Sequence, residues 1–271
     1  AELFPFKDHP FRVQDDEEME NAVQSISQYG VLTPLIARPR PEGGYEIISG
    51  HRRQHAAQLA GLETVPVIVR DMSDDAATIL MVDSNLQREN ILPSERAFAY
   101  KMKMEAVKHQ GARSDLTSGQ LGPKLRSDEQ VAKDAGESRK QIQRFIRLTN
   151  LIPKLLDMVD NAQLSFNPAV NLSYLDEAQQ KIFIEAMGDA QNAPSLSQSK
   201  RLKDLAQQGD FNYDSAYAIM NEVKKDELDK VVIKNDTLRK YFSESSTPRE
   251  MQEQIVGLLE KNKSTQLVFA N

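Results

Sequence analysis

The sequence predicts an α+β protein built from a small mixed-sheet domain, an all-α domain and a small α/β module at the C-terminal end. Strand-like and helix-like patterns alternate over about the first 90 residues, which favours an α+β unit. Two short helical patterns joined by a glycine follow between residues 127 and 149, which is typical of a helix-turn-helix. We expect the domains to span residues 1–92, 93–190 and 191–271.

Composition limits the classes of function. Of 271 residues, 39% are hydrophobic and 27% are charged, which describes a globular chain able to bury a core. The net charge of −6 argues against a uniformly basic coat, so any DNA-binding surface must be a local patch. The absence of cysteine excludes disulfides, thiolate zinc sites and a cysteine nucleophile, and fits a reducing cytoplasm. No apolar run approaches the ~20 residues of a membrane span, and no signal peptide is visible.

The first domain begins with an extended, proline-containing lead-in. A helix with acids in its first turn then runs from Asp15 to Tyr29 and ends at Gly30. The other elements expected up to residue 110 are strands over 31–38, 45–48 and 65–70 and helices over 51–60, 78–86 and 93–110. Residues 111–126 contain glycines, a proline and basic side chains, which together predict a loop.

The stretch from Tyr45 to Ala60 carries the clearest chemical signal of this domain. A short strand is followed by Gly50 and then by a helix whose first turn holds Arg52 and Arg53. A helix N-terminus attracts anions, glycine lets a phosphate approach the backbone, and guanidiniums supply forked donors. This pattern fits a phosphate site, and an ordinary strand–turn–helix with solvated arginines fits it equally well.

The helix-turn-helix pattern is marked by helix caps and by a glycine turn. Ser127 with Gln130, and Ser138 with Gln141, fit capping boxes, and Gly136 fits the turn between the helices. On the second helix one face is apolar, formed by Ile142, Phe145, Ile146 and Thr149. The residues assigned to DNA contact are Ser138, Arg139, Lys140, Gln143, Arg144 and Arg147.

The polar face of that second helix is of one sign, with no acid between residues 138 and 149. A solvated helix face normally mixes charges of both signs. Arginine, lysine and glutamine are also the side chains that contact base edges and phosphates. The helix is therefore predicted to bind double-stranded DNA, rather than being a solvated helix or an RNA surface.

Beyond residue 150 the chain is predicted to be mostly helical. The elements expected are helices over 151–160 and 168–175, a linker over 192–199, helices over 200–208 and 213–225, a strand over 230–234 and a final helix over 248–261. A strand and a helix of this size bury little apolar surface alone. The C-terminal module is therefore expected to dimerise, or else to dock on its own chain.

Three ordered motifs before the helix-turn-helix carry a resemblance to a known family. They comprise Thr33, Pro34 and Arg38, then Gly50, Arg52, Arg53 and Ala56 with Gly61, then Asn85, Gln87 and Arg88. Followed by the helix-turn-helix, they resemble the ParB family of partition proteins over about residues 5–175. The resemblance implies a ParB/sulfiredoxin-like N-terminal fold that binds CTP with Mg²⁺, and a middle domain that binds a palindromic DNA site. It further implies a homodimer that closes as a clamp on DNA, with a possible ParA-like ATPase as partner. Such a protein would be located in a bacterial cytoplasm, associated with the nucleoid or with a plasmid.

Site residues follow from the resemblance position by position. Arg52 and Arg53 would bind the triphosphate, and Gly50 would form the tight turn. Asn85 and Arg88 would lie on the side of the site that binds the metal and phosphate. The full set carried over as nucleotide-binding is Thr33, Pro34, Arg38, Gly50, His51, Arg52, Arg53, Asn85 and Arg88, with Asn85 also as a metal ligand.

Two positions depart from the family pattern. Most members have glutamate where His51 and Ser84 stand here, and those carboxylates are associated with metal and water handling during CTP hydrolysis. Their loss leaves the phosphate-binding arginines but removes the hydrolytic groups. We therefore expect nucleotide binding with weak or absent hydrolysis, at most a slow CTPase, and we assign no catalytic residue.

Other functions stay open at this point. A transcription regulator could use the same helix-turn-helix without a nucleotide site, and a kinase-like enzyme could use the same N-terminal fold, whereas a sulfiredoxin would need cysteine. His51 and His55 have the spacing of two metal ligands, but the arginines between them disfavour a cation. The scattered acids Asp71, Asp74, Asp75 and Asp83 are interpreted as helix caps rather than a metal cluster.

Overall fold

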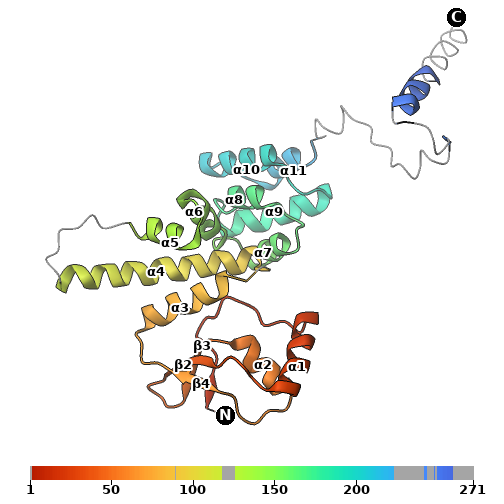
Figure 1. The fold of residues 1–271 in the computed structure, drawn as a ribbon. Helices are drawn as coiled ribbons and strands as arrows, with labels where there is room; N and C mark the ends of the chain where they lie inside the picture. Colours follow the sequence, from red (N-terminus) through yellow and green to blue (C-terminus); the bar gives the residue numbers. More distant parts are fainter. Residues whose placement is uncertain are drawn as a thin grey trace, which may run out of the picture. The chain divides into compact units, whose positions relative to one another are not determined.

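The structure is a computed structural model of residues 1–271 (Figure 1). It describes residues 2–88, 90–117, 126–222, 241–242, 247 and 249–258, with the backbone alone over 111–117. The chain forms two compact units, residues 1–221 and 222–271. In the second unit residues 249–258 are helical, as predicted, and the predicted strand over 230–234 lies outside the described residues.

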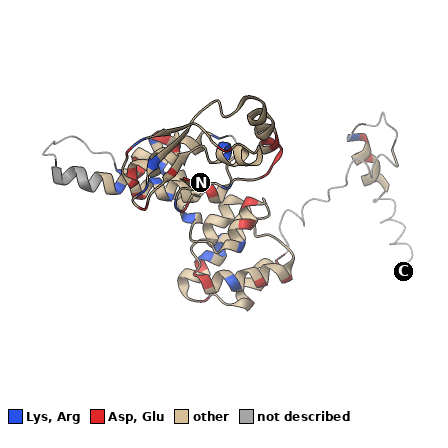
Figure 2. Ribbon diagram, turned by 90° about the horizontal axis from the view of Figure 1, so that it is seen from below, with Lys and Arg blue, Asp and Glu red and all other residues tan. Residues whose placement is uncertain are grey.

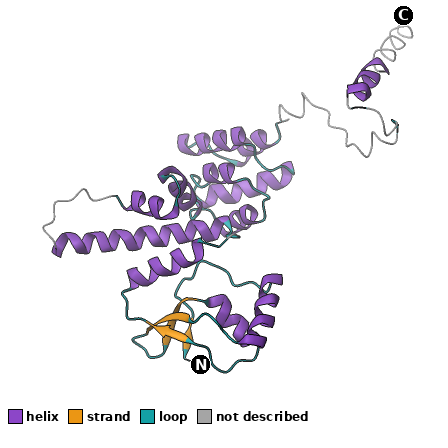
Figure 3. Cartoon of the chain, in the orientation of Figure 1, coloured by secondary structure: helices purple, strands orange, loops and turns teal. Residues whose placement is uncertain are grey.

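The N-terminal part of the first unit contains a four-stranded mixed sheet in the order β1-β3-β2-β4 (Figure 3). The strands are β1 (Leu3–Phe4), β2 (Leu35–Pro39), β3 (Tyr45–Ser49) and β4 (Val67–Val69). β2 and β3 are antiparallel, while β1 pairs with β3 and β4 with β2 in parallel. This confirms the predicted mixed sheet and adds β1, which is too short to give a sequence pattern.

Three helices accompany the sheet: α1 (Glu17–Tyr29), α2 (His51–Leu59) and α3 (Asp74–Leu86). α1 packs on α2 through the buried side chains of Met19, Ile26, Ala56 and Ala57. α3 packs on β3 and on the following helix, α4 (Pro93–Thr117). The alanines of α2 let α1 approach closely, and α2 also contacts β2.

The helical part continues from α4 through the predicted helix-turn-helix. Its elements are α5 (Ser127–Ala135), α6 (Arg139–Leu148), α7 (Pro153–Asp160), α8 (Phe166–Leu172), α9 (Glu177–Ala190), α10 (Leu196–Gln208) and α11 (Tyr213–Met220). The first turn of α4 is fixed to the end of α7, because the Ser94 N–H and hydroxyl donate to the two carboxylate oxygens of Asp160 at 2.9 and 2.6 Å. The fold class is therefore α+β, with a mixed-sheet domain followed by a helical one.

Some predicted boundaries are wrong. α4 continues to Thr117 instead of ending near Gln110, because a single glycine inside a long helix costs only about 1 kcal/mol. The linker predicted over 192–199 ends earlier, since Ser195 caps α10. The first cap of the helix-turn-helix is at Arg126, whose N–H donates to Glu129, rather than at Ser127.

The core of the helical part extends past residue 190, where the sequence predicts a domain boundary. Leu202 of α10 and Ala216, Ile219 and Met220 of α11 lie in the same buried cluster as the side chains of α4 to α9. No helix within the described ranges is both long enough and apolar enough to cross a membrane.

Truncation of Leu202 tests whether α10 belongs to this core. Its side chain is 0% exposed, so Leu202→Ala should lower the free energy of unfolding by about 2–5 kcal/mol through lost burial and a cavity. Leu196→Ala on the same helix is the matched control, because Leu196 is 56% exposed and its loss should change stability by less than about 0.5 kcal/mol. Urea denaturation measures both, and equal values for the two variants would contradict the shared core.

Candidate functional site

The strand–turn–helix predicted around Gly50 is present. β3 ends at Ser49, Gly50 takes the left-handed conformation with φ of 107°, and α2 begins at His51. A Cβ on Gly50 would lie 2.9 Å from the Leu35 Cγ, so a larger residue would be strained both by its backbone and by its neighbour. The tight turn places the first residues of α2 directly beside the end of the sheet.

Arg52 is held at the N-terminus of α2 by acids of α1. Its guanidinium contacts both Asp16 carboxylate oxygens, at 2.9 and 3.3 Å, and a Glu18 oxygen at 3.4 Å. The hydrogen bond from Arg52 lowers the pKa of Asp16, and the same bond raises the pKa of Arg52. Asp16 also caps α1 by accepting from the Met19 N–H. An anion binding here would therefore compete with carboxylates already in place.

One pocket of about 290 Å³ brings Arg52 together with Arg88, which come from two separate sequence motifs. Its lining residues are Arg12, Gln14, Asp16, Glu18, Arg52, Arg88, Asn90, Ile91, Leu92 and Glu95. Glu95 fixes one wall by accepting from the backbone N–H groups of Arg12, at 2.7 Å, and Leu92, at 3.2 Å. Sequence reasoning missed Arg12, because the extended lead-in carries no periodic pattern that would place it.

The guanidiniums of this pocket fit a polyphosphate. Three guanidiniums, those of Arg12, Arg52 and Arg88, can pair with phosphate oxygens. The carboxylates of the same pocket are already engaged, those of Asp16 and Glu18 by Arg52 and that of Glu95 by two backbone N–H groups, so they do not form a preformed Mg²⁺ site in this conformation.

Arg53 lies beside Arg52 in sequence but has different partners. Its guanidinium donates to the backbone carbonyls of Thr33 and Pro34, the latter at 2.8 Å, and burial lowers its pKa. Three predicted site residues are thus brought together, through main-chain oxygens. In this arrangement Arg53 ties α2 to the start of β2, which is a structural role.

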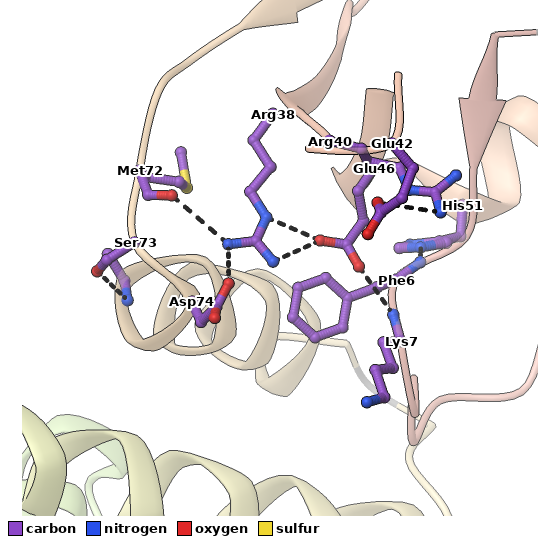
Figure 4. A network of polar contacts seen from close by, with 11 residues as sticks. Phe6, Lys7, Arg38, Arg40, Glu42, Glu46, His51, Met72, Ser73 and Asp74 are labelled. Carbon is purple, nitrogen blue, oxygen red and sulfur yellow. Dashed lines mark hydrogen bonds and ion pairs between the residues drawn. The ribbon is translucent and has the colours of Figure 1, made fainter. Parts of the chain in front are cut away.

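Arg38 lines a different pocket from Arg52 and Arg88. Figure 4 shows the polar contacts of its guanidinium. Its guanidinium contacts a Glu46 oxygen at 2.7 Å and an Asp74 oxygen at 2.6 Å. The other oxygen of the buried Glu46 accepts from the Lys7 N–H at 3.1 Å. This network joins β2, β3, α3 and the segment after β1, so the Arg38 charge is already balanced in this conformation.

The ring of His51 packs on His9, with ring centroids 3.9 Å apart. Its Nε2 accepts from the Phe6 N–H at 3.3 Å, so the neutral ring carries its proton on Nδ1. Burial, with a smaller contribution from His9, lowers the pKa of His51 to about 3. Burial thus favours the neutral form of His51. Because Nε2 is occupied, His51 does not offer a base to water here.

The end of α3 carries Ser84 and Asn85, whose side chains bond within the helix. The Ser84 hydroxyl and the Asn85 amide both donate to the Met81 carbonyl, at 3.0 and 2.8 Å. Asn85 therefore does not line the pocket of Arg52 and Arg88, and its role as a metal ligand stays a prediction. Arg88 follows α3 and reaches that pocket.

The acids interpreted as caps mostly have basic partners. Asp74 contacts Arg38, Asp75 contacts His109 and Asp83 contacts Lys103. The cap of α3 is Ser73. His55 contacts Asp15 at 2.7 Å. Within the part of the chain that the structure describes, no cluster of three or more His, Asp or Glu could hold a metal ion.

Acids of α5 contact the start of α6. Ser138 caps α6 by accepting from the Gln141 N–H, as predicted. Arg139 contacts Asp128 at 3.0 Å and Glu129 at 2.9 Å, and the Gln143 amide donates to Asp128 at 3.0 Å. The helix face that is of one sign in sequence therefore meets acids from the preceding helix.

The later arginines of α6 rest on aromatic rings. Arg144 stacks over Phe166 at 5.2 Å and donates to the Asn167 side chain. Arg147 stacks over Tyr174 at 3.8 Å and donates to the Ser173 carbonyl at 3.1 Å. These contacts orient both guanidiniums, while Lys140 is exposed. Phe166, Asn167 and Tyr174 lie far along the chain, so the sequence pattern of α6 gave no signal for them.

The structure defines a class of two-domain protein. A mixed-sheet domain with an arginine-lined pocket is joined by a long helix to a helix-turn-helix domain. Residues 1–86 match the family model of the ParB N-terminal domain, and residues 124–198 match that of the ParB HTH domain. The chain belongs to the ParB family.

Two relatives, one of them solved in two complexes, illustrate the similarity. A probable chromosome-partitioning protein ParB of Pseudomonas putida is 34% identical over 65% of this chain and 54% of its own length. The C-terminally truncated chromosome-partitioning protein ParB of Caulobacter crescentus, solved in complex with the centromeric parS site, is 28% identical over 76% of this chain and 96% of that one, with a TM-score of 0.44. The same protein complexed with CTP-γ-S is 31% identical over 66% and 93%, with a TM-score of 0.31. The chain spans about half the length of the Pseudomonas relative.

The buried histidine gives a pH prediction. The pKa of His51 is about 3 in the folded state and ordinarily 6.5, so between these values the unfolded state binds more protons. The free energy of unfolding should therefore fall as the pH falls through this window, by up to about 1.4 kcal/mol per pH unit. His51→Gln keeps a polar acceptor near the Phe6 N–H and cannot titrate.

Chemical denaturation of both proteins from about pH 7.5 to about pH 5 isolates this contribution as the difference between them. We expect the parent to lose stability on acidification relative to His51→Gln. A difference that does not change with pH would contradict the buried neutral state of His51.

Proposed function

We propose that this protein binds a specific, palindromic double-stranded DNA site through α6 and binds CTP with Mg²⁺ in its N-terminal domain. In this proposal it acts as a homodimeric clamp in the partition of a plasmid, mobile element or chromosome, with a ParA-like ATPase as a partner. The observation that carries the nucleotide side is the convergence of Arg52 and Arg88 in one pocket at the N-terminus of α2. The relative solved with CTP-γ-S supports the choice of nucleotide.

The DNA side of the proposal is supported by the arrangement of α6. Its buried face, with Ile142, Phe145 and Leu148, is fixed to the helical core, so the opposite face is presented rigidly. Arg144 and Arg147 are held by aromatic rings, which reduces the conformational entropy lost when they bind. The relative solved with the parS site supports a centromere-like DNA target.

The expectation of weak or absent hydrolysis is supported by the surroundings of two positions. At His51 the Nε2 atom is occupied by a backbone N–H, and at Ser84 the hydroxyl donates to its own helix. Neither supplies a carboxylate to orient or deprotonate water. The carboxylates nearest the arginines, Asp16 and Glu18, are engaged by Arg52. Nucleotide dissociation, rather than hydrolysis, is therefore proposed to end the bound state.

The DNA proposal predicts the effect of removing Arg144 and Arg147. The double variant with alanine at both positions should lose at least about 1–3 kcal/mol of DNA-binding free energy, and the slope of log affinity against log salt should become shallower by up to about 2. Fluorescence anisotropy with genomic duplexes at several salt concentrations measures both quantities. Lys154→Ala on α7 is the control, since Lys154 is exposed and lies on neither α5 nor α6. Unchanged affinity and salt slope in the double variant would place the DNA surface elsewhere.

The nucleotide proposal predicts the effect of Arg88→Ala. Loss of one charged hydrogen-bonding group should weaken CTP binding by about 10-fold or more, while DNA binding in the absence of nucleotide stays near the parent value. Isothermal titration calorimetry with CTP and Mg²⁺ measures the first quantity, and ATP tests the base preference. Arg70→Ala is the matched control, because Arg70 is an exposed arginine of the same domain outside the pocket. Arg53→Ala is less informative, since Arg53 also holds two backbone carbonyls. No CTP binding by the parent would overturn this half of the proposal.

A further inference from the structure

Lys103 of α4 is a charged residue in a fully buried position. Its side chain is only 1% exposed, and it is one of the largest fully buried side chains among the described residues. Its Nζ contacts a carboxylate oxygen of Asp83 at 2.7 Å and one of Asp134 at 2.9 Å. Asp83 belongs to α3 and Asp134 to α5. One ammonium group thus joins the last helix of the N-terminal domain to the first helix of the helix-turn-helix.

Because Lys103 is buried, its ammonium group depends on its two carboxylate partners for compensation. An ammonium group removed from water is strongly unfavourable unless opposite charges and hydrogen bonds compensate it. The two carboxylates supply this compensation and, with side chains 44% and 41% exposed, remain partly hydrated themselves. If either carboxylate moved away, the other would be left to balance a buried cation alone. The arrangement therefore favours the position of α3 in which both pairs are made.

Where α3 meets the helix-turn-helix, polar groups lie beside the apolar side chains of Leu86 and Ala135, which pack against the core of the helical part. A pocket of about 480 Å³ lies there, lined by Asp83, Leu86, Gln87, Arg96, Tyr100, Asp134, Ala135 and Glu137. Glu137, in the turn between α5 and α6, accepts from Tyr100 at 2.9 Å and from Arg96 at 3.3 Å. These bonds attach the turn to α4, whereas Lys103 reaches α3 as well. A buried charge network of this kind adds little to the free energy of folding. Its main effect is to favour one arrangement of α3, α4 and α5.

The chain positions of the two acids connect them to the proposed binding regions. Asp83 lies in the last turns of α3, beside Asn85 and shortly before Arg88. Asp134 lies at the end of α5, directly before the turn that leads into α6. A displacement of the end of α3 would therefore change the pairing of Lys103, the same side chain that holds Asp134 of α5.

We propose that Lys103 is a positioning residue that couples the occupancy of the Arg52–Arg88 pocket to DNA binding by α6. This inference rests on the proposed function. Because binding free energies are reciprocal, the nucleotide should change the DNA affinity by the same factor by which DNA changes the nucleotide affinity.

Lys103→Met tests the coupling without leaving a buried charge. Methionine fills a similar volume, and exchange of a buried ion pair for an apolar side chain is often neutral for stability, so the variant should fold with a Tm near that of the parent. In the parent, DNA affinities with and without CTP and Mg²⁺ should differ by about 5-fold or more, and in Lys103→Met the ratio should approach 1. Lys101→Met is the matched control, because Lys101 is exposed on the same helix and its loss should leave the ratio unchanged.

Asp83→Asn supplies a second variant. It leaves Lys103 with one carboxylate and should also reduce the ratio. When combined with Lys103→Met it should reduce the ratio no further, because both changes break the same contact. A purely structural role would lower the Tm in these variants and leave the ratio intact.

A readout that needs no nucleotide keeps the inference separate from the nucleotide proposal. Addition of a short mixed-sequence duplex at low salt should change amide hydrogen exchange over residues 83–88 in the parent and in Lys101→Met, but not in Lys103→Met. The role of Lys103 would be overturned if the hydrogen-exchange response to DNA persisted in Lys103→Met. It would also be overturned if the ratio of DNA affinities with and without CTP and Mg²⁺ stayed at the parent value in this variant. Failure of the parent to bind CTP would overturn the nucleotide proposal, while the exchange response to DNA would still decide the inference.

Discussion

The packing of α4 is the constraint on which the rest of the first unit depends. One side of this helix places Ala97, Tyr100 and Val107 in the core of the helical part, and another places Ala99 in the core beneath the sheet. Its N-terminal turn is fixed by Asp160, and its middle carries the buried Lys103. Two hydrophobic cores therefore share one wall. Neither domain can shift against α4 without disturbing apolar packing, which is dense and responds to small displacements.

The charged side chains of this protein act through individual contacts rather than through a net charge of one sign over the surface. The net charge is −6, and Figure 2 shows basic and acidic residues interspersed along the described chain. The arginines at the proposed sites are already engaged: Arg52 by Asp16, Arg139 by Asp128, and Arg147 by an aromatic ring and a carbonyl. Such contacts orient the guanidiniums before a ligand arrives. They also require a phosphate to displace or share a carboxylate, which favours multiply charged ligands over weak anions.

The environment of α2 explains how one helix start can serve both structure and binding. Gly50 permits the turn, Arg53 turns inward to two carbonyls, and Arg52 faces the pocket. His51 is packed on His9 and bonded to the Phe6 backbone, so it stabilises the lead-in segment that contributes Arg12 to the same pocket. His51 thus has a packing role at the start of α2.

The sequence alone determined the elements whose signals are local. The turn at Gly50, the cap at Ser138 and the apolar face of α6 depend on spacing and on backbone preferences, and all three are present as predicted. The tertiary structure alone decided which charged side chains meet. Arg52 lies beside Arg88 but apart from Arg38, acids of α5 reach Arg139, and Lys103 is buried between two carboxylates. Partners brought together by packing from distant parts of the chain leave no periodic trace in the sequence, because a guanidinium or ammonium group looks the same whether solvent or a carboxylate surrounds it.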